Sequence, residues 1–101
     1  MTEHFFVPKV NVIESSAGFS VEVLGRTGLR YTESEKILEV DSEVLAGTAG
    51  IMLLANSIQN WKSPTHSIDT AERSRIIENI CRAFAWRGHN VEVYPENWHD
   101  A

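Results

Sequence analysis

The chain has 101 residues, enough for one domain with one hydrophobic core and too few for two. Its composition, 43% hydrophobic and 23% charged, is ordinary for a globular protein, and its longest apolar run, Ile51 to Ala55, is far shorter than the ~20 residues that span a bilayer. A net charge of −5 disfavours nucleic acid as a direct ligand, because phosphate binding requires a basic surface. Glu3 stands where a secretory signal would be basic, so we expect a cytoplasmic protein. We expect a single domain over residues 1–101, with its core in about 5–94 and a frayed tail in 95–101.

Alternating apolar and polar residues in the first half of the chain predict an antiparallel β-meander. Turn residues separate the alternating runs about every eight to ten positions, a spacing typical of consecutive hairpins. Pro8 restricts the first run to a sheet edge or a strand entry. We expect Ser42–Thr48, which is short and interrupted by glycine, to form a single turn. Phe5–Val7 is expected to be a loosely held extended start, and the expected strands after it are Val10–Glu14, Phe19–Leu24, Leu29–Glu33 and Lys36–Asp41.

The second half of the chain predicts a strand, a helix and a final strand. Gly50–Asn56 is apolar on both faces, as expected for a strand well inside a sheet, and Asn90–Tyr94 alternates. The strand–helix–strand order permits these two strands to lie parallel. Ser57–His66 is expected to be a connection that contains Trp61.

The helical pattern runs from about Thr70 to Arg87. Asp69, with Glu72 three positions on, marks its start by offering acceptors to unpaired N–H groups, and Gly88 marks its end. The helix predicted here has an apolar stripe of Ile76, Ile77, Ile80, Cys81 and Phe84, opposite a polar side of Arg75, Glu78, Asn79 and Arg82. A striped helix cannot bury its own apolar side. We therefore expect an α+β fold, a mostly antiparallel sheet of about six strands in a meander, with one long amphipathic helix packed on one face and a final strand after it.

Few residues offer reactive chemistry, and we expect no catalytic residue, no metal, no cofactor and no enzymatic activity. The four histidines, His4, His66, His89 and His99, lack metal-binding spacings, and no serine lies in a nucleophile elbow. Gly25 and Gly28 precede a strand rather than a helix, which fits a hairpin turn and not a phosphate-binding loop. Cys81 lies on or beside the apolar stripe and is expected to be a buried, inert thiol.

The densest group of charges is a run of five acids, with only Lys36 among them, at Glu33, Glu35, Glu39, Asp41 and Glu43. It is either a solvated face or a contact surface for a basic partner. Trp61, in a polar connection, either plugs one end of the core or belongs to a contact surface. Trp86 is expected to be packed and Trp98 to be the most exposed of the three tryptophans.

The order of these elements resembles a known group of proteins. It combines the Gly25-Arg26 hairpin, the strand segment GIMLLANSIQNW that ends at Trp61, Pro64, the helix ERSRIIENICRAFAWRG and the strand NVEVY. From about Val10 to Tyr94 the chain is similar to small immunity proteins of bacterial polymorphic-toxin and contact-dependent growth inhibition systems, among them the immunity protein 74 family. The resemblance implies a protein that binds and neutralises a cognate toxin domain without catalysis. Such toxins are often basic nucleases, which agrees with the acidic run.

On this interpretation the chain is a monomer that binds one toxin and has no contact with nucleic acid or membrane. The run of five acids would steer the partner, and three residues are candidate anchors: Arg26, Tyr31 and Trp61. Two other classes of function stay open. One is a small ligand-binding or enzymatic α+β domain with a pocket at the seam between sheet and helix, and the other is a homo-oligomeric structural protein that uses a sheet edge.

Overall fold

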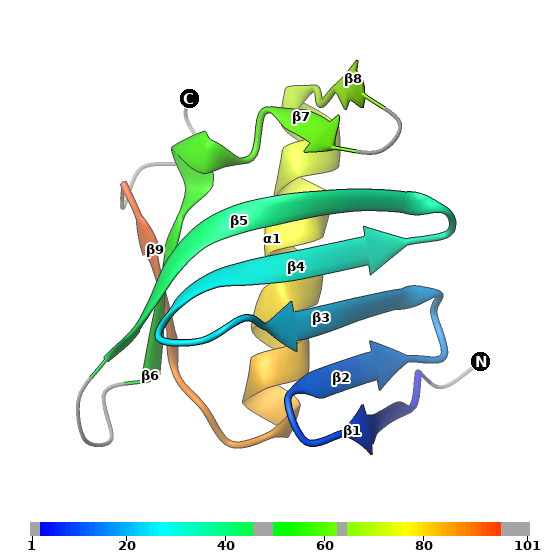
Figure 1. Ribbon diagram of the computed structural model, residues 1–101, viewed down its shortest axis with the longest axis vertical. Helices are drawn as coiled ribbons and strands as arrows, with labels where there is room; N and C mark the ends of the chain where they lie inside the picture. Colours follow the sequence, from blue (N-terminus) through cyan, green and yellow to red (C-terminus); the bar gives the residue numbers. More distant parts are fainter. Residues whose placement is uncertain (1–2, 46–49, 63–64, 96–101) are drawn as a thin grey trace.

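A computed structural model describes residues 3–45, 50–62 and 65–95 and shows a curved sheet around a single helix (Figure 1). The helix, α1, spans Thr70–Trp86, and a short 3₁₀ turn, η1, spans Ala55–Ser57. The strands are β1 (Phe5–Lys9), β2 (Val12–Ser15), β3 (Phe19–Val23), β4 (Thr27–Glu33), β5 (Lys36–Leu45), β6 (Gly50–Leu54), β7 (Asn60–Lys62), β8 (Thr65–Ser67) and β9 (Val91–Tyr94).

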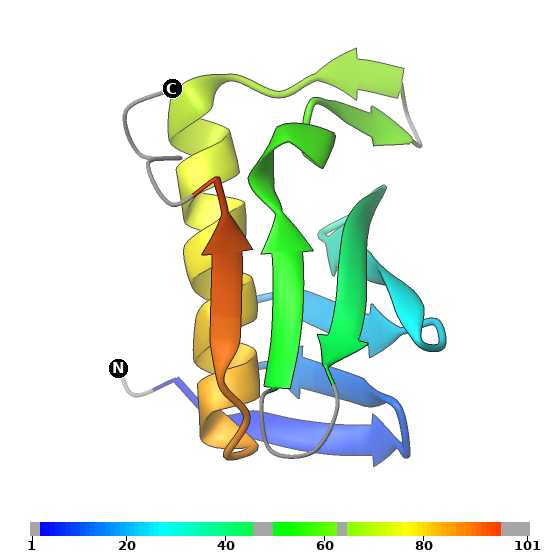
Figure 2. The ribbon, with the colours of Figure 1, turned by 90° about the vertical axis from the view of Figure 1, so that its left-hand side faces the viewer.

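The main sheet has seven strands in the order β1-β2-β3-β4-β5-β6-β9. Neighbours from β1 to β6 are antiparallel, and β9 is parallel to β6, with Ile51 opposite Val91 and Leu54 opposite Tyr94. The predicted α+β class, the meander and the final strand after the helix are therefore confirmed. The sheet bends between β5 and β6, so β3 to β5 cross in front of α1 in Figure 1 while β6 and β9 run along its side in Figure 2.

The helix begins and packs as its sequence indicates. The carboxylate of Asp69 accepts a 2.8 Å hydrogen bond from the backbone N–H of Glu72, which satisfies one of the unpaired donors of the first turn. Ile76, Ile77, Ile80, Ala83 and Phe84 are buried against the concave face of the sheet. Full burial of each isoleucine contributes about 1.5–3 kcal/mol, so this stripe supplies much of the core.

The inner face of the sheet completes the core. Alternate residues of each strand point toward α1, and the intervening polar residues point outward, as the period of two requires. The buried hydrophobic side chains that the main sheet contributes are Ile13, Phe19, Val21, Leu29, Tyr31, Leu38, Val40, Ile51 and Leu53. The rings of Phe19 and Tyr31 are stacked, with centroids 5.7 Å apart.

Several local predictions were wrong. Ser42–Leu45 continues β5 instead of forming a turn, because these four residues pair with Gly50–Leu53 of β6. Positions 46–48 of the predicted turn lie outside the described residues. The second strand begins at Val12, because Val10 lies in the turn after β1 and is almost fully exposed.

The connection after β6 also has more structure than predicted. It contains η1 and a two-stranded hairpin of β7 and β8, which lies over the N-terminal end of α1 (Figure 1). Asn79, predicted on the polar side of the helix, is buried, and Trp86 is half-exposed against Phe5 rather than packed. Trp98 and the tail from residue 96 lie outside the described residues.

Candidate interaction surface

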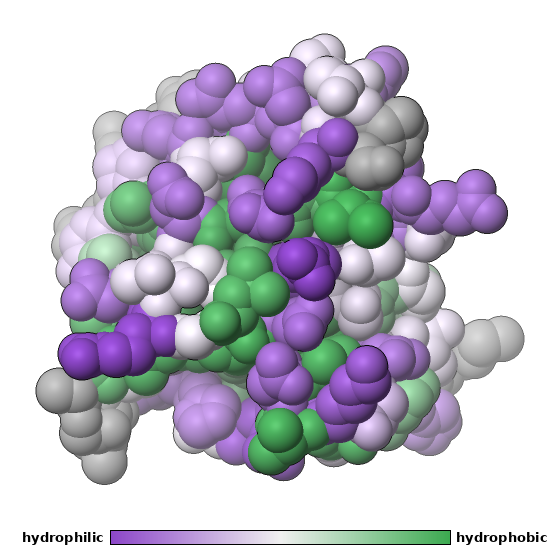
Figure 3. Space-filling model, in the orientation of Figure 1, coloured by the Kyte–Doolittle hydropathy of each residue, from purple (hydrophilic) through white to green (hydrophobic). Residues whose placement is uncertain are grey.

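In Figure 1 no described helix or strand lies in front of the outer face of β3 to β5. Its outward side chains form rows across neighbouring strands, one of which joins Glu22, Arg30 and Glu39 on β3, β4 and β5. The surface over these strands is mainly hydrophilic, with small apolar patches between the polar groups (Figure 3). An uncovered sheet face of this kind is available to another molecule.

Two of the five acidic residues predicted to contact a partner already form ion pairs within the chain. Glu39 pairs with Lys62 Nζ at 2.8 Å and with Arg30 at 3.8 Å, and the hydrogen bond from Lys62 lowers the pKa of its carboxyl. Glu33 pairs with Arg75 of α1 and accepts a 2.8 Å hydrogen bond from the hydroxyl of Tyr31. Glu33 therefore lies at the junction between sheet and helix rather than on the open face.

The other three acids are free of such pairing. Glu35, in the turn between β4 and β5, and Asp41 and Glu43, on β5, are exposed and have no ion pair with any described residue. Their charges are available to a partner. The structure thus divides the run into two paired and three unpaired carboxylates, a distinction that the sequence does not reveal.

The three predicted anchors also differ from one another. Arg26 is exposed in the hairpin between β3 and β4, and its carbonyl accepts a 2.8 Å hydrogen bond from the N–H of Val44. Tyr31 and Trp61 are 0% and 1% exposed, so neither side chain is accessible to a partner and neither is retained as a candidate contact. For Trp61 the core alternative is therefore correct.

Trp61 fills the end of the core beneath the β7–β8 hairpin. Its ring lies 6.2 Å from that of Tyr31, its Nε1 donates a 3.3 Å hydrogen bond to Glu72, and Lys36 Nζ lies 4.9 Å from its centroid. The burial of Trp61 and the ion pair between Lys62 and Glu39 both attach this short hairpin to the rest of the fold.

The structure contains a polar network beside the core that the sequence patterns did not predict. The hydroxyl of Tyr31 donates to Glu33 and accepts a 2.9 Å hydrogen bond from Asn79 Nδ2, while Arg82 donates a 2.8 Å hydrogen bond to Asn79 Oδ1. Burial raises the pKa of Tyr31, so the phenol stays protonated and acts as a donor. The network fixes α1 against β4 and uses no exposed group of β5.

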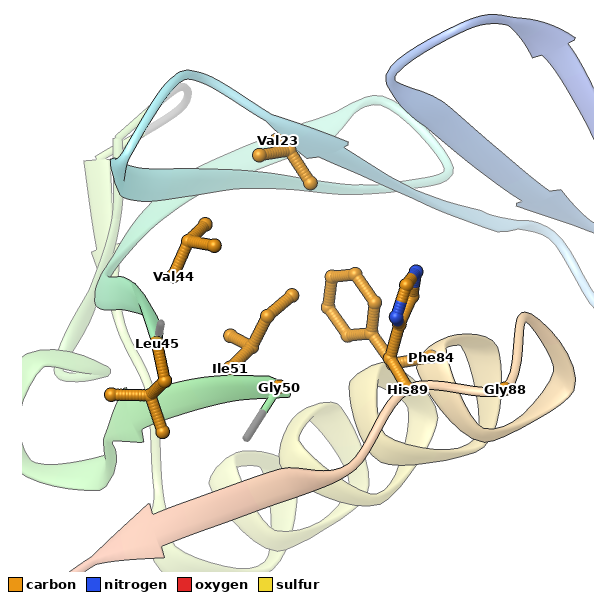
Figure 4. Close-up of a pocket in the computed structure, with 8 residues that line it drawn as sticks. All are labelled: Val23, Val44, Leu45, Gly50, Ile51, Phe84, Gly88 and His89. Carbon is orange, nitrogen blue, oxygen red and sulfur yellow. The ribbon is translucent and has the colours of Figure 1, made fainter. Parts of the chain in front are cut away.

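A hollow lies at the seam between sheet and helix, where the ligand-binding alternative placed a pocket. Its volume is about 480 Å³, and its lining is shown in Figure 4: Val23, Val44, Leu45, Gly50, Ile51, Phe84, Gly88 and His89. His89, whose ring lies 6.3 Å from that of Phe84, is the one polar side chain in this lining. A single imidazole among apolar groups offers no pair of converging catalytic groups.

The described residues offer little else to chemistry. They contain no group of three or more His, Cys, Asp or Glu side chains placed to hold a metal ion. Cys81 is half-buried beside the core, and burial raises the pKa of its thiol, which keeps it in the unreactive protonated form. Among the described residues no helix has the length and apolarity needed to span a membrane.

Fold and surface together define a small α+β domain with an exposed outer sheet face. The sequence model of the Immunity protein 74 family matches residues 20–94, from β3 to β9. The chain belongs to this family. Membership supports an immunity function against a toxin and implies that the chain binds a cognate toxin protein, as a non-enzymatic inhibitor. Searches of curated proteins and of solved structures gave no match.

Proposed function

We propose that this chain is a cytoplasmic inhibitor of a toxin domain delivered by a bacterial contact-dependent inhibition system. The toxin is a basic nuclease, and one monomer of the inhibitor covers the surface with which the toxin holds its nucleic acid. The observation that carries this proposal is the set of unpaired carboxylates at Glu35, Asp41 and Glu43 beside the uncovered outer face of the sheet.

The proposed mechanism follows from charge. A nuclease binds phosphates through Lys and Arg side chains, and the same side chains are attracted to a row of carboxylates. Complementary charge raises association rate constants to as much as about 10⁸–10⁹ M⁻¹s⁻¹ at low salt, against about 10⁵–10⁶ M⁻¹s⁻¹ without it. Fast capture suits an inhibitor that must act before the toxin reaches its substrate.

The contact residues differ in their roles. Glu35, Asp41 and Glu43 attract the toxin, and Arg26, at the tip of the neighbouring hairpin, borders the same surface. Glu39 exchanges its partners Lys62 and Arg30 for cations of the toxin. Glu33 supports the surface from below through its pair with Arg75.

Growth rescue tests this function. The chain is co-expressed with the toxic C-terminal region encoded by the gene directly upstream, with expression of the toxin alone as the reference. We expect the chain to restore growth and the purified pair to form a one-to-one complex by size exclusion with light scattering. Loss of growth despite stable expression of both proteins would contradict the proposal.

A further inference from the structure

A second hollow, of about 450 Å³, lies on the outer side of the sheet at the end of β6 and β9. It is lined by Asp41, Leu54, Asn56, Ser57, Tyr94 and Pro95. Leu54 and Tyr94 are cross-strand neighbours, and each is 38% exposed, so the two form an adjacent pair of accessible large apolar side chains. Ser42 pairs with Leu53, so Asp41, Leu54 and Tyr94 fall in one row across three adjacent strands.

One row of outward side chains beside this hollow is negatively charged. The next row along the same strands places Glu43, Met52 and Glu92 side by side, and Asp41, Glu43 and Glu92 have no ion pair with any described residue. In Figure 2 these three strands, β5, β6 and β9, lie side by side with their outer face toward the viewer. The apolar pair is therefore bordered by negative charge on that side, while Glu39, paired with Lys62 and Arg30, lies on the other side of Asp41 along β5.

The hydroxyl of Ser57, which also lines the hollow, bonds to the backbone on either side of it. Ser57 Oγ accepts a 2.9 Å hydrogen bond from the N–H of Asp41 and donates a 2.7 Å bond to the carbonyl of Leu54. Because Ser57 uses its hydroxyl in this way, Asp41 is the one charged group left to meet an occupant among the residues that line the hollow.

We propose that this hollow receives an arginine side chain of the toxin, a refinement that rests on the proposed function for the identity of the partner. The aliphatic stem lies along Leu54, the planar guanidinium stacks on the ring of Tyr94, and its N–H groups donate to the carboxylate of Asp41. A purely apolar side chain would leave Asp41 without a partner, and an acidic one would be repelled. Arginine suits the site better than lysine because a planar, weakly hydrated cation stacks on an aromatic ring and binds a carboxylate through two N–H groups.

A single arginine is enough to probe the site without the toxin. ¹⁵N-labelled protein is titrated with N-acetyl-arginine methylamide, and with the citrulline analogue as an uncharged control of the same shape. We expect saturable shifts of the amide signals of Asp41, Leu54 and Tyr94 with the arginine compound and none with citrulline. Asp41→Asn and Tyr94→Ala should each weaken binding of the arginine compound at least fivefold. Tyr94→Phe keeps the aromatic ring and should bind the compound as the wild type does.

The matched control is Glu14→Gln, which removes a carboxylate from the outer face on β2, away from the hollow, and should leave the titration unchanged. Equal shifts with citrulline, no saturable shift, or full binding by Asp41→Asn would overturn the arginine assignment. Growth rescue by the wild-type chain is a separate measurement, so an empty hollow with intact rescue would refute this inference alone. Arginine binding without rescue would refute the proposed function and leave the hollow as a cation site.

Discussion

The side-chain amide of Asn79, on α1, donates a 2.9 Å hydrogen bond to the hydroxyl of Tyr31, on β4. Both side chains are buried, and the same hydroxyl donates to Glu33. The bond joins the helix to the middle of the sheet, at the edge of the apolar core where Glu33 and Arg82 complete a polar network. It explains why one polar residue interrupts the buried side of the helix.

The Asn79–Tyr31 bond should show coupling in a double-mutant cycle. Tyr31→Phe leaves the buried amide of Asn79 without an acceptor, and Asn79→Leu removes the amide that donates to the Tyr31 hydroxyl. Each substitution should lower the free energy of unfolding by about 1–3 kcal/mol. The double variant should lose less than the sum, because neither polar group is then left unpaired. Urea unfolding gives the free energy of unfolding of the wild type, the two single variants and the double variant. Strictly additive losses of stability would contradict a direct bond.

Tyr31 should also make stability depend on alkaline pH. Burial raises its pKa in the folded state above the ordinary value near 10, so the folded protein holds the phenolic proton where the unfolded chain has lost it. The stabilisation is complete below about pH 10 and is lost as pH rises beyond it, by up to about 1.4 kcal/mol per pH unit. Between pH 9 and pH 11 the free energy of unfolding should fall more steeply for the wild type than for Tyr31→Phe. Parallel decreases in the two proteins would contradict a raised pKa of Tyr31 in the folded state.

Trp61 should behave as a core residue and not as a contact. Trp61→Ala removes a fully buried side chain and should destabilise the protein by about 3–5 kcal/mol. Trp61→Phe keeps an aromatic group beside Tyr31 and should lose less stability. Since the ring is inaccessible, the folded Trp61→Phe protein should bind the toxin with wild-type affinity, measured by titration calorimetry. A large loss of affinity in a fully folded variant would return Trp61 to the interface.

Gly50 should tolerate replacement by alanine less well than Gly18 does. It has φ of 96°, and a Cβ there would collide with the backbone carbonyl of Asn90, whose oxygen accepts the N–H of Ile51 just before β9. Gly18 is a matched control with φ of 100° and open space around its Cβ position. Gly18→Ala should cost about 1–3 kcal/mol from backbone strain alone, and Gly50→Ala should cost more because β6 and β9 must also separate. Equal melting temperatures for the two variants would contradict this close approach.

Sequence patterns predicted the elements whose local signals agree with their packing. Alternation along β3 and β4 gave their faces, and Asp69 gave the start of the helix, because these signals act over a few residues. The parallel pairing of β6 and β9 followed from the order of strand, helix and strand. Burial of Tyr31 also follows from its position on the inner face of β4, although the sequence interpretation placed it among the contacts.

The remaining features depend on partners far along the chain. Ser42–Leu45 is part of a strand because it pairs with β6. The local sequence, with its turn and glycine residues, does not indicate that pairing. Asn79 is buried because Tyr31 offers its hydroxyl, which helical periodicity cannot indicate. The unpaired state of Asp41 and the hollow beside it arise where three strands meet, so sequence spacing alone did not distinguish Asp41 from Glu39.

The central claim, that the unpaired acids near β5 capture a basic toxin, is tested most directly by association kinetics. Glu35→Lys and Asp41→Lys should each slow association by about tenfold at low ionic strength and reduce the dependence of the rate on salt. Glu78→Lys is the matched control: it changes the net charge equally, from an exposed position on α1. The account predicts slow capture by the two sheet variants and nearly wild-type capture by the helix variant, measured by stopped flow with the purified toxin domain. Unchanged rates for both sheet variants, or equal slowing by all three, would contradict it.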